Sequence, residues 1–180
     1  AIAGRQFSTA GRPLRVLYAG GLSIRKGVPY LLQAVEPLRA EVVVTLAGSK
    51  SPEMHEILPR FRTHEHLPYL SKSGLREVFV RHDVLVMPTL GDSFGFVTVE
   101  AMASGLPVIA SRHAGAPVPD EAWRVPAHDA EAIRLRLLAY HADRELLRHD
   151  SEVAAAFAAG LRPSDYRSKA KAMFSRLLAD

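Results

Sequence analysis

Residues 14–47 read LRVLYAGGLSIRKGVPYLLQAVEPLRAEVVVTLA, and this segment decides the fold. It holds a short apolar run, a glycine-rich loop, a stretch with helical periodicity and a second apolar run. An apolar run without polar alternation is typical of a strand that is buried on both faces, as in a parallel sheet covered by helices. The segment therefore predicts a strand–helix–strand unit with parallel strands.

The same alternation continues along the chain to about residue 111. We expect strands at 15–19, 41–46, 63–67, 83–87 and 107–111, and helices between them at about 28–38, 52–59, 73–80 and 98–104. Three later segments, 129–140, 144–159 and 164–178, show helical periodicity with alanine and leucine on one side. These alternations predict an α/β fold: a Rossmann-like, doubly wound parallel sheet with helices on both faces and extra C-terminal helices.

Size and composition bound the classes of protein that remain. The 180 residues fit one domain that can bury its own core, and we expect a flexible leader at 1–13 and a single domain at 14–180. The chain has no cysteine, which excludes disulfides, zinc–thiolate sites and thiol nucleophiles. A chain without cysteine suits a reducing compartment, so we expect a cytoplasmic location.

The charged residues do not indicate a polyanionic or metal partner. The net charge is +4, and the basic residues are scattered and not interleaved with aromatic ones, which argues against nucleic acid as a partner. The histidines do not fall in a metal-ligand spacing with carboxylates. We therefore expect no nucleic acid, no metal and no cofactor.

Two loops that follow predicted strands carry the chemistry, because ligands of open α/β sheets bind beyond the carboxyl ends of the strands. The first loop contains Gly20 and Gly21, and then Arg25 and Lys26 directly before a predicted helix. Cations at the positive end of a helix are unfavourable unless an anion offsets them. A phosphate would do so and would also accept the free N–H groups of the helix. A tight turn with two solvated side chains explains the loop equally well.

The second loop begins the segment at residues 89–109, TLGDSFGFVTVEAMASGLPVI. Seven residues separate Asp92, in the loop, from Glu100, in the predicted helix. The backbone of 93–96 can offer N–H groups to a phosphate or a sugar hydroxyl, and Glu100 can accept hydrogen bonds from two vicinal ribose hydroxyls. For either carboxylate alone, a capping role or an interaction with the helix dipole is the simpler interpretation.

Together, the two loops resemble the donor-binding signature of the retaining glycosyltransferases of family 4, which have the GT-B fold. That signature has an acidic residue, seven others and a glutamate, then Ala-Met-Ala, a small residue and Gly-Leu-Pro-Val-Ile. The first loop is similar to the family's glycine-rich stretch that ends in Lys-Gly. The resemblance covers about residues 14–109. It implies a glycosyltransferase that transfers a sugar from a UDP-, GDP- or ADP-sugar donor to an acceptor hydroxyl.

The resemblance also implies a role for each matching residue. Lys26 would contact the diphosphate, Glu100 the ribose and Asp92 the donor sugar. The base would lie between 47–48 and 66–68. The donor site expected in this way, with Arg25 included, consists of Gly20, Gly21, Arg25, Lys26, Gly48, His66, Leu67, Asp92, Ser93, Phe94, Gly95, Phe96, Thr98 and Glu100.

The sequence departs from the family pattern at three places. The family most often has glutamate at the position of Asp92, and it commonly has arginine, a second diphosphate ligand, at the position of Gly21. Our hypothesis is that Arg25 supplies that missing charge from the other end of the loop. The region 117–126 is also shorter and less rich in glycine than the family pattern.

We expect the chain to be the C-terminal half of a GT-B enzyme, to need an N-terminal acceptor domain of the same polypeptide, and to transfer little sugar alone. The resemblance also allows the parent protein to associate with a membrane surface. Two alternatives stay open. One is a non-catalytic nucleotide-binding module of Rossmann-like fold, and the other is an epimerase or phosphorylase relative, although the Gly-x-Gly-x-x-Gly sequence of dinucleotide enzymes is absent.

Overall fold

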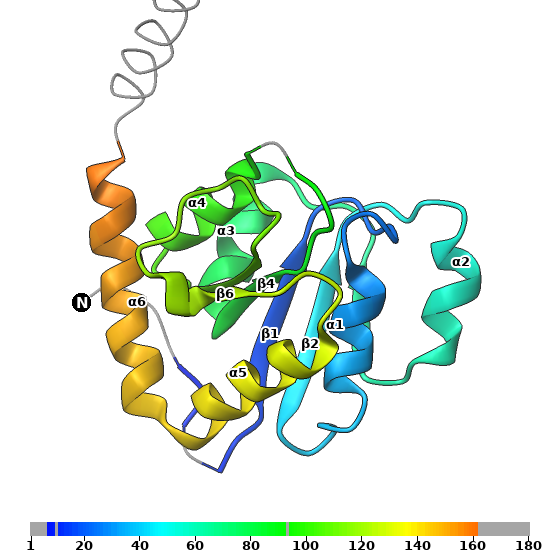
Figure 1. Cartoon of the computed structure of the whole chain (residues 1–180), viewed down its shortest axis with the longest axis horizontal. Helices are drawn as coiled ribbons and strands as arrows, with labels where there is room; N and C mark the ends of the chain where they lie inside the picture. Colours follow the sequence, from blue (N-terminus) through cyan, green and yellow to red (C-terminus); the bar gives the residue numbers. More distant parts are fainter. Residues whose placement is uncertain (1–6, 10, 93, 162–180) are drawn as a thin grey trace, which may run out of the picture.

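The computed structural model describes residues 7–9, 11–92 and 94–161. A six-stranded parallel sheet has the order β3-β2-β1-β4-β5-β6. The strands are β1 (Leu14–Ala19), β2 (Val42–Ala47), β3 (His64–Leu67), β4 (Val84–Met87), β5 (Val108–Ser111) and β6 (Arg124–Val125). The order runs outward from β1 in one direction and then from β4 in the other, which is the doubly wound arrangement. The predicted fold class is confirmed (Figure 1).

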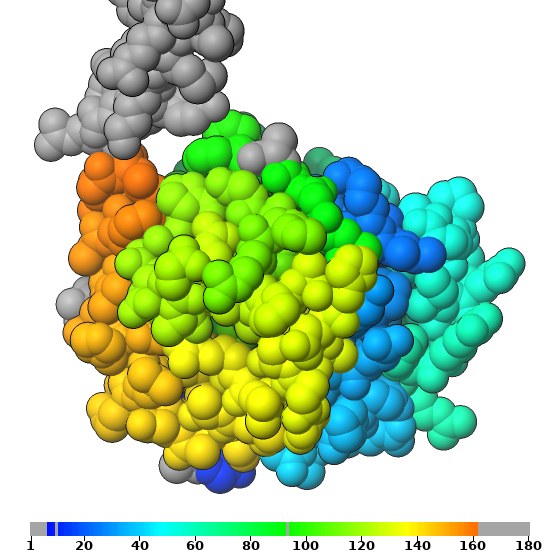
Figure 2. Space-filling view, viewed as in Figure 1, coloured from blue at the N-terminus to red at the C-terminus, as the bar shows by residue number. Residues whose placement is uncertain are grey.

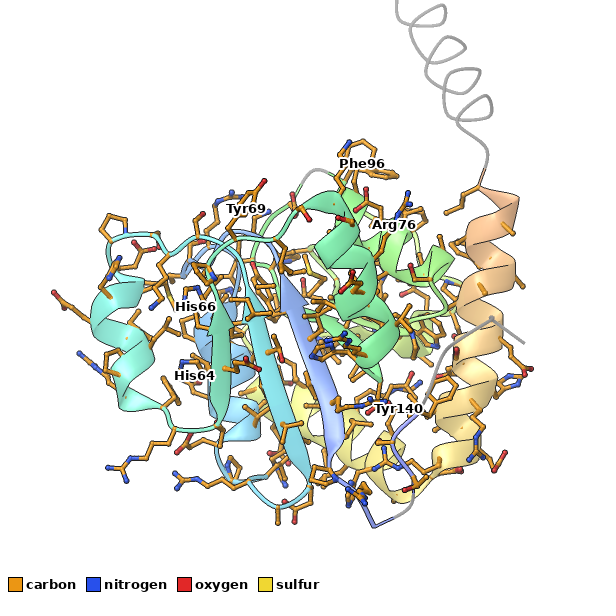
Figure 3. The ribbon with its side chains drawn as sticks, turned by 180° about the vertical axis from the view of Figure 1, so that it is seen from behind. His64, His66, Tyr69, Arg76, Phe96 and Tyr140 are labelled. Atoms are coloured by element: carbon orange, nitrogen blue, oxygen red, sulfur yellow. The ribbon has the colours of Figure 1, made fainter. Side chains whose placement is uncertain are left out.

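Helices cover both faces of this sheet. They are α1 (Val28–Val35), α2 (Met54–Ile57), α3 (Lys72–Arg81), α4 (Phe96–Ala103), α5 (Ala130–Ala142) and α6 (Arg144–Gly160), with short 3-10 turns η1 (Leu58–Arg60) and η2 (Glu121–Trp123). α1 and α5 pack together on one face (Figure 1), and α3 lies on the other, which is the face seen in Figure 3. α4 packs against α6 and against β4 and β5.

Short sequence signals fix where the helices begin and end. The Ser71 hydroxyl accepts a hydrogen bond from the backbone of Gly74 and caps α3, and the carboxylates of Asp129 and Asp143 cap α5 and α6 in the same way. α1 ends at Val35, earlier than predicted, and Pro37 follows two residues later. Proline has no N–H group and cannot continue the helical hydrogen-bond pattern.

The strand register brings the functional loops to one edge. β1 and β2 pair from Leu14 with Val42 to Ala19 with Ala47, so their carboxyl ends are level. β1, β4 and β5 are buried almost completely, with the apolar side chains of both faces in one core. The loops after β1, β2, β3 and β4 therefore leave the sheet side by side, at the upper edge in Figure 1.

Several boundaries differ from the predictions. The sheet has a sixth strand, β6, and the predicted helix at 52–59 is only the one-turn α2 followed by η1. α4 begins at Phe96, two residues before the predicted start. The predicted helix at 164–178 lies outside the described residues, as do residues 1–6 and 10 of the expected leader. Within that leader, Phe7 packs on the core and the Ser8 backbone donates to Asp83.

Candidate functional site

A cavity of about 510 Å³ lies at the carboxyl ends of the strands. Four loops make its wall. The loop after β1 contributes Gly20, Gly21 and Lys26, and the loop after β2 contributes Gly48. The other residues of the wall, which follow β3 and β4 or belong to the strand ends, include Tyr18, Ala47, Pro68, Tyr69, Leu70, Asp92, Phe94, Gly95, Phe96 and Val97. The two loops singled out in the sequence thus meet in one cavity.

The centre of the site is an ion pair between these loops. The Lys26 Nζ atom lies 2.5 Å from the Asp92 Oδ2 atom, and the two side chains are 19% and 16% exposed. Lys26 immediately precedes Gly27, the N-cap of α1, and Asp92 is held by a hydrogen bond from its backbone N–H to the His113 carbonyl. The pair supplies one cation and one carboxylate that both face the cavity.

The amino end of α4 forms the wall beside Asp92. Its N-cap is Gly95, with φ 67°, and among the described residues no side chain caps this end. Phe96 and Val97, the first two helical residues, line the cavity. The Thr98 hydroxyl is buried and has no hydrogen-bond partner among the described residues. Open N–H groups at a helix start attract anions. Thr98, a predicted site residue, is not part of the wall and lies buried behind Gly95.

Two glycines let the loops approach this closely. A Cβ atom on Gly27 would lie 1.9 Å from the Pro88 carbonyl oxygen, and one on Gly48 would lie 1.9 Å from the Gly20 carbonyl oxygen. Both have positive φ, of 72° and 144°. A larger residue at Gly27 would push the first loop away from the loop after β4, and one at Gly48 would push it away from the loop after β2. The glycines therefore fix how narrow the cavity is.

Arg25 and Glu100 lie outside the wall of the cavity. The Arg25 guanidinium donates to the Gly91 carbonyl at 2.8 Å, and the Arg25 carbonyl accepts from the Leu90 backbone at 2.9 Å. Arg25 thus joins the two loops, whose atoms meet at the upper edge of Figure 2. Glu100 is exposed on α4, one turn beyond Phe96. Ser93 lies outside the described residues.

His66 and Leu67 do not line the cavity, but both contact Gly48, which does. The His66 ring bonds the Gly48 carbonyl at 2.8 Å, and the Leu67 carbonyl accepts from the Gly48 backbone at 2.9 Å. The wall itself is made by the residues that follow, Pro68 and Tyr69. In Figure 3, His66 lies on β3 and Tyr69 lies above it at the upper edge of the sheet.

Two aromatic residues that the sequence did not indicate, Tyr18 and Tyr69, contribute to the site, and the predicted Phe96 lines the cavity beside them. Tyr18 is buried under the first loop, and its hydroxyl donates to the Gly21 carbonyl at 2.8 Å. Burial raises the pKa of Tyr18, and the negative charge of Asp92 adds to this effect, so the hydroxyl keeps its proton and remains a donor. Tyr69 and Phe96 line the cavity and are 81% and 73% exposed. An exposed aromatic after a strand is the signal that points to Tyr69, whereas Tyr18 has the pattern of a core residue.

Metal-ligand clusters and membrane-spanning helices are both absent from the described part of the chain. In ranges 7–9, 11–92 and 94–161, no three His, Asp or Glu side chains gather as metal ligands. Over the same ranges, no helix is long and apolar enough to cross a bilayer.

The fold and the site define a Rossmann-like α/β domain whose cavity, at the carboxyl ends of its strands, suits an anionic ligand. Comparison with known families makes this class more specific, because residues 13–143 match the family described as "Glycosyl transferases group 1". The chain belongs to this family.

Individual relatives agree with this assignment. The chain is 32% identical to the D-inositol 3-phosphate glycosyltransferase of Streptomyces bingchenggensis over 153 residues, which cover 73% of this chain and 34% of the relative. The chain spans about a third of the length of the curated relatives that it matches.

Two solved structures have the same fold. One is HepE of Anabaena in complex with UDP-glucose, with a TM-score of 0.72 and 19% identity over 82% of this chain and 44% of that one. The other is the C-terminal domain of a group 1 family glycosyl transferase from Francisella tularensis. Its TM-score is 0.72 and its identity 17%, over 82% of this chain and 86% of that one.

Proposed function

We propose that the chain is the donor-binding domain of a retaining glycosyltransferase and holds a nucleoside-diphosphate sugar. The observation that carries this proposal is the Lys26–Asp92 pair at the amino end of α4, 2.5 Å apart in a cavity of about 510 Å³. A diphosphate needs a cation and free N–H groups, and a donor sugar offers hydroxyls to a carboxylate. Lys26 and the N–H groups of α4 would bind the diphosphate, and Asp92 would accept hydrogen bonds from the sugar hydroxyls.

The same groups explain how the domain would assist transfer. As the bond between sugar and diphosphate breaks, negative charge grows on the diphosphate. Lys26 and the open N–H groups of α4 are placed to stabilise that charge before it develops, which is the electrostatic contribution that preorganised donors make. Asp92 would hold the sugar through its hydroxyls.

The remainder of the donor extends along the cavity. The base would lie at the end lined by Ala47, Gly48, Pro68 and Tyr69, and Glu100 would turn from the α4 surface to the ribose hydroxyls. The HepE structure is a complex with UDP-glucose, so UDP and UDP-glucose are the first probes. The acceptor would bind against a second domain, and we expect little or no transfer by this chain alone.

The test is a calorimetric titration of the chain with UDP-, GDP- and ADP-sugars and the matching free nucleotides. We expect saturable binding of one base class, with tighter binding when the sugar is attached, and loss of binding in Lys26→Ala. Glu100→Ala should remove the preference for a ribonucleotide over its 2′-deoxy analogue. Equal affinity with and without the sugar would support a non-catalytic nucleotide module instead. Lack of binding to every probe would contradict the proposal.

Arg25 has a separate test. As a second diphosphate ligand its guanidinium, which donates to the Gly91 carbonyl at 2.8 Å and lies outside the wall of the cavity, must move toward the cavity or use its other N–H groups. Arg25→Ala should then weaken nucleotide binding as much as Lys26→Ala does. If only the lysine variant loses affinity, Arg25 serves to join the loops and does not bind phosphate.

A further inference from the structure

The segment after β5 does not line the cavity but packs against the loop that carries Asp92. The Asp92 backbone donates to the His113 carbonyl at 3.3 Å, and Asp92 forms a bridge with Ala114. Ala116 lies behind Gly95, where a Cβ atom on that glycine would be 4.0 Å from the Ala116 Cβ. Residues 113–116 therefore form the support on which the second loop rests.

This support belongs to no helix or strand. Three carbonyl groups in and next to it, those of Ser111, Ala114 and Ala116, point to one place, and all three residues are buried. One bond, from the Ala114 backbone to the Ser111 carbonyl at 3.1 Å, closes a turn within the segment. Buried carbonyls require donors, so something outside the segment must hold it in shape.

That donor is the side chain of Arg124 on β6, at the edge of the sheet. Its Nη1 donates to the carbonyls of Ser111 at 3.2 Å and Ala114 at 3.0 Å, and its Nη2 donates to that of Ala116 at 2.9 Å. The side chain is 14% exposed, and its Nε lies 3.5 Å from the carboxylate of Glu121. The planar guanidinium can serve several acceptors at fixed angles, which an ammonium group cannot do.

We propose that Arg124 is a positioning residue for Asp92. It does not line the cavity. It acts through residues 113–116 on the loop that carries the carboxylate. Arg124 thereby sets the distance between Asp92 and the ligand, although no atom of Arg124 reaches the ligand. The positional role stands on the geometry alone, whereas its consequence for sugar recognition rests on the proposed function.

Amide hydrogen exchange of the whole chain tests the positional role without any ligand. In Arg124→Met, peptides covering 89–95 and 112–118 should exchange at least tenfold faster, with peptides from β1 and β2 unchanged. Arg112→Met is the matched control, because Arg112 is on the same segment, 61% exposed, and contacts Glu121 at 3.5 Å. It should leave all these peptides unchanged. No acceleration at 89–95 in Arg124→Met would overturn the proposal.

A conservative variant covers the case in which Arg124→Met loses the whole fold. Arg124→Lys keeps the charge and can serve part of the carbonyl set, so it should accelerate exchange at 89–95 by an intermediate factor while the sheet stays protected. Uniform acceleration over all peptides in both variants would show that Arg124 supports the whole fold and would overturn a specific role at Asp92.

Affinities measured with UDP and UDP-glucose test the consequence for the site. In the variant that stays folded, affinity for UDP-glucose should fall about tenfold, while affinity for UDP changes less than twofold. Equal losses for both probes would overturn the link to the sugar. If the wild-type chain binds neither these probes nor the GDP and ADP pairs, the proposed function fails, and the exchange data still decide the role of Arg124.

Discussion

The Lys26 ammonium and the Asp92 carboxylate come from loops after different strands, yet their Nζ and Oδ2 atoms lie 2.5 Å apart. The chain thus places a negative charge directly beside the cation that we assign to the diphosphate. A phosphate that binds Lys26 comes close to the Asp92 carboxylate, which repels it and shares the ammonium group with it. The carboxylate therefore weakens the binding of a free nucleotide and favours a ligand whose hydroxyl groups donate hydrogen bonds to it.

This relationship predicts opposite effects for the two residues. Lys26→Met should lower the affinity for the free nucleoside diphosphate at least tenfold, because a hydrogen bond to a charged group contributes about 1.5–3 kcal/mol. Asp92→Asn should raise that affinity a few-fold and remove the preference for the attached sugar. Titration calorimetry with UDP and UDP-glucose measures both. The competition between phosphate and Asp92 is refuted if Asp92→Asn weakens binding of the free nucleotide as much as Lys26→Met does.

The close approach of the loops predicts that alanine is much more destabilising at Gly48 than at Gly21. Gly48→Ala would bring a Cβ to 1.9 Å from the Gly20 carbonyl oxygen at φ 144°, whereas a Cβ on Gly21 meets nothing within 4 Å. Gly48→Ala should therefore cost about 2–3 kcal/mol of unfolding free energy, since loop backbone must shift and a strained φ remains. Gly21→Ala should stay within about 0.5 kcal/mol of wild type. Urea denaturation decides between these outcomes, and equal stability of the two variants would contradict the close approach of the Gly48 and Gly20 loops.

The sequence predicted five of the six strands, and four of these five are apolar. β1, β2, β4 and β5 follow from nearly continuous runs of Val, Leu and Ile, and the loops with Lys26 and Asp92 follow from where those runs end. β6 escaped prediction because it is two residues long and exists only through its pairing with β5. A strand of that length carries no periodicity.

The supporting contacts of the site could not be predicted for a related reason. The bonds from Tyr18 to Gly21 and from His66 to Gly48 depend on which loop each residue faces after folding. The same holds for Arg124. In the sequence it cannot be told from an exposed arginine, because its three carbonyl partners come from another segment. Local pattern places a residue on a strand or a loop, whereas these partners are set by the packing of segments that are distant along the chain.

Tyr69 provides a test of where the base lies. Tyr69 is 81% exposed and lines the cavity, and it follows β3, next to the residues that we assign to the base. Tyr69→Ala should weaken nucleotide binding by about 1–3 kcal/mol, the range found for base–aromatic stacking, and Tyr69→Phe should retain the affinity because it keeps the ring. Titration with UDP measures the change. Unchanged affinity in Tyr69→Ala would place the base elsewhere in the cavity.

Asp83 directly precedes β4, at the end of the sheet away from the cavity, and accepts a hydrogen bond from the Ser8 backbone in the leader. Burial alone would raise the pKa of this carboxyl, but hydrogen bonds from the Arg15 side chain and from the backbones of Arg15 and Ser8, with the Arg15 charge, lower it below its ordinary 3.8. A carboxyl with a lowered pKa in the folded state stabilises the protein fully above its ordinary pKa. That stability is lost as the pH falls through the lower folded value.

Asp83→Asn should therefore lower the unfolding free energy by about 3 kcal/mol at pH 7, because it leaves the buried part of the Arg15 contact without its counter-charge. The difference from wild type should remain constant down to about pH 5 and shrink steadily below pH 3.8. Urea denaturation at pH 7, 5 and 3 measures it. Glu152→Gln, at an exposed site on α6, is the control and should change stability little at any of these values. A difference between Asp83→Asn and wild type that persists unchanged at pH 3 would show that the side chain acts by shape and hydrogen bonding and not by its charge.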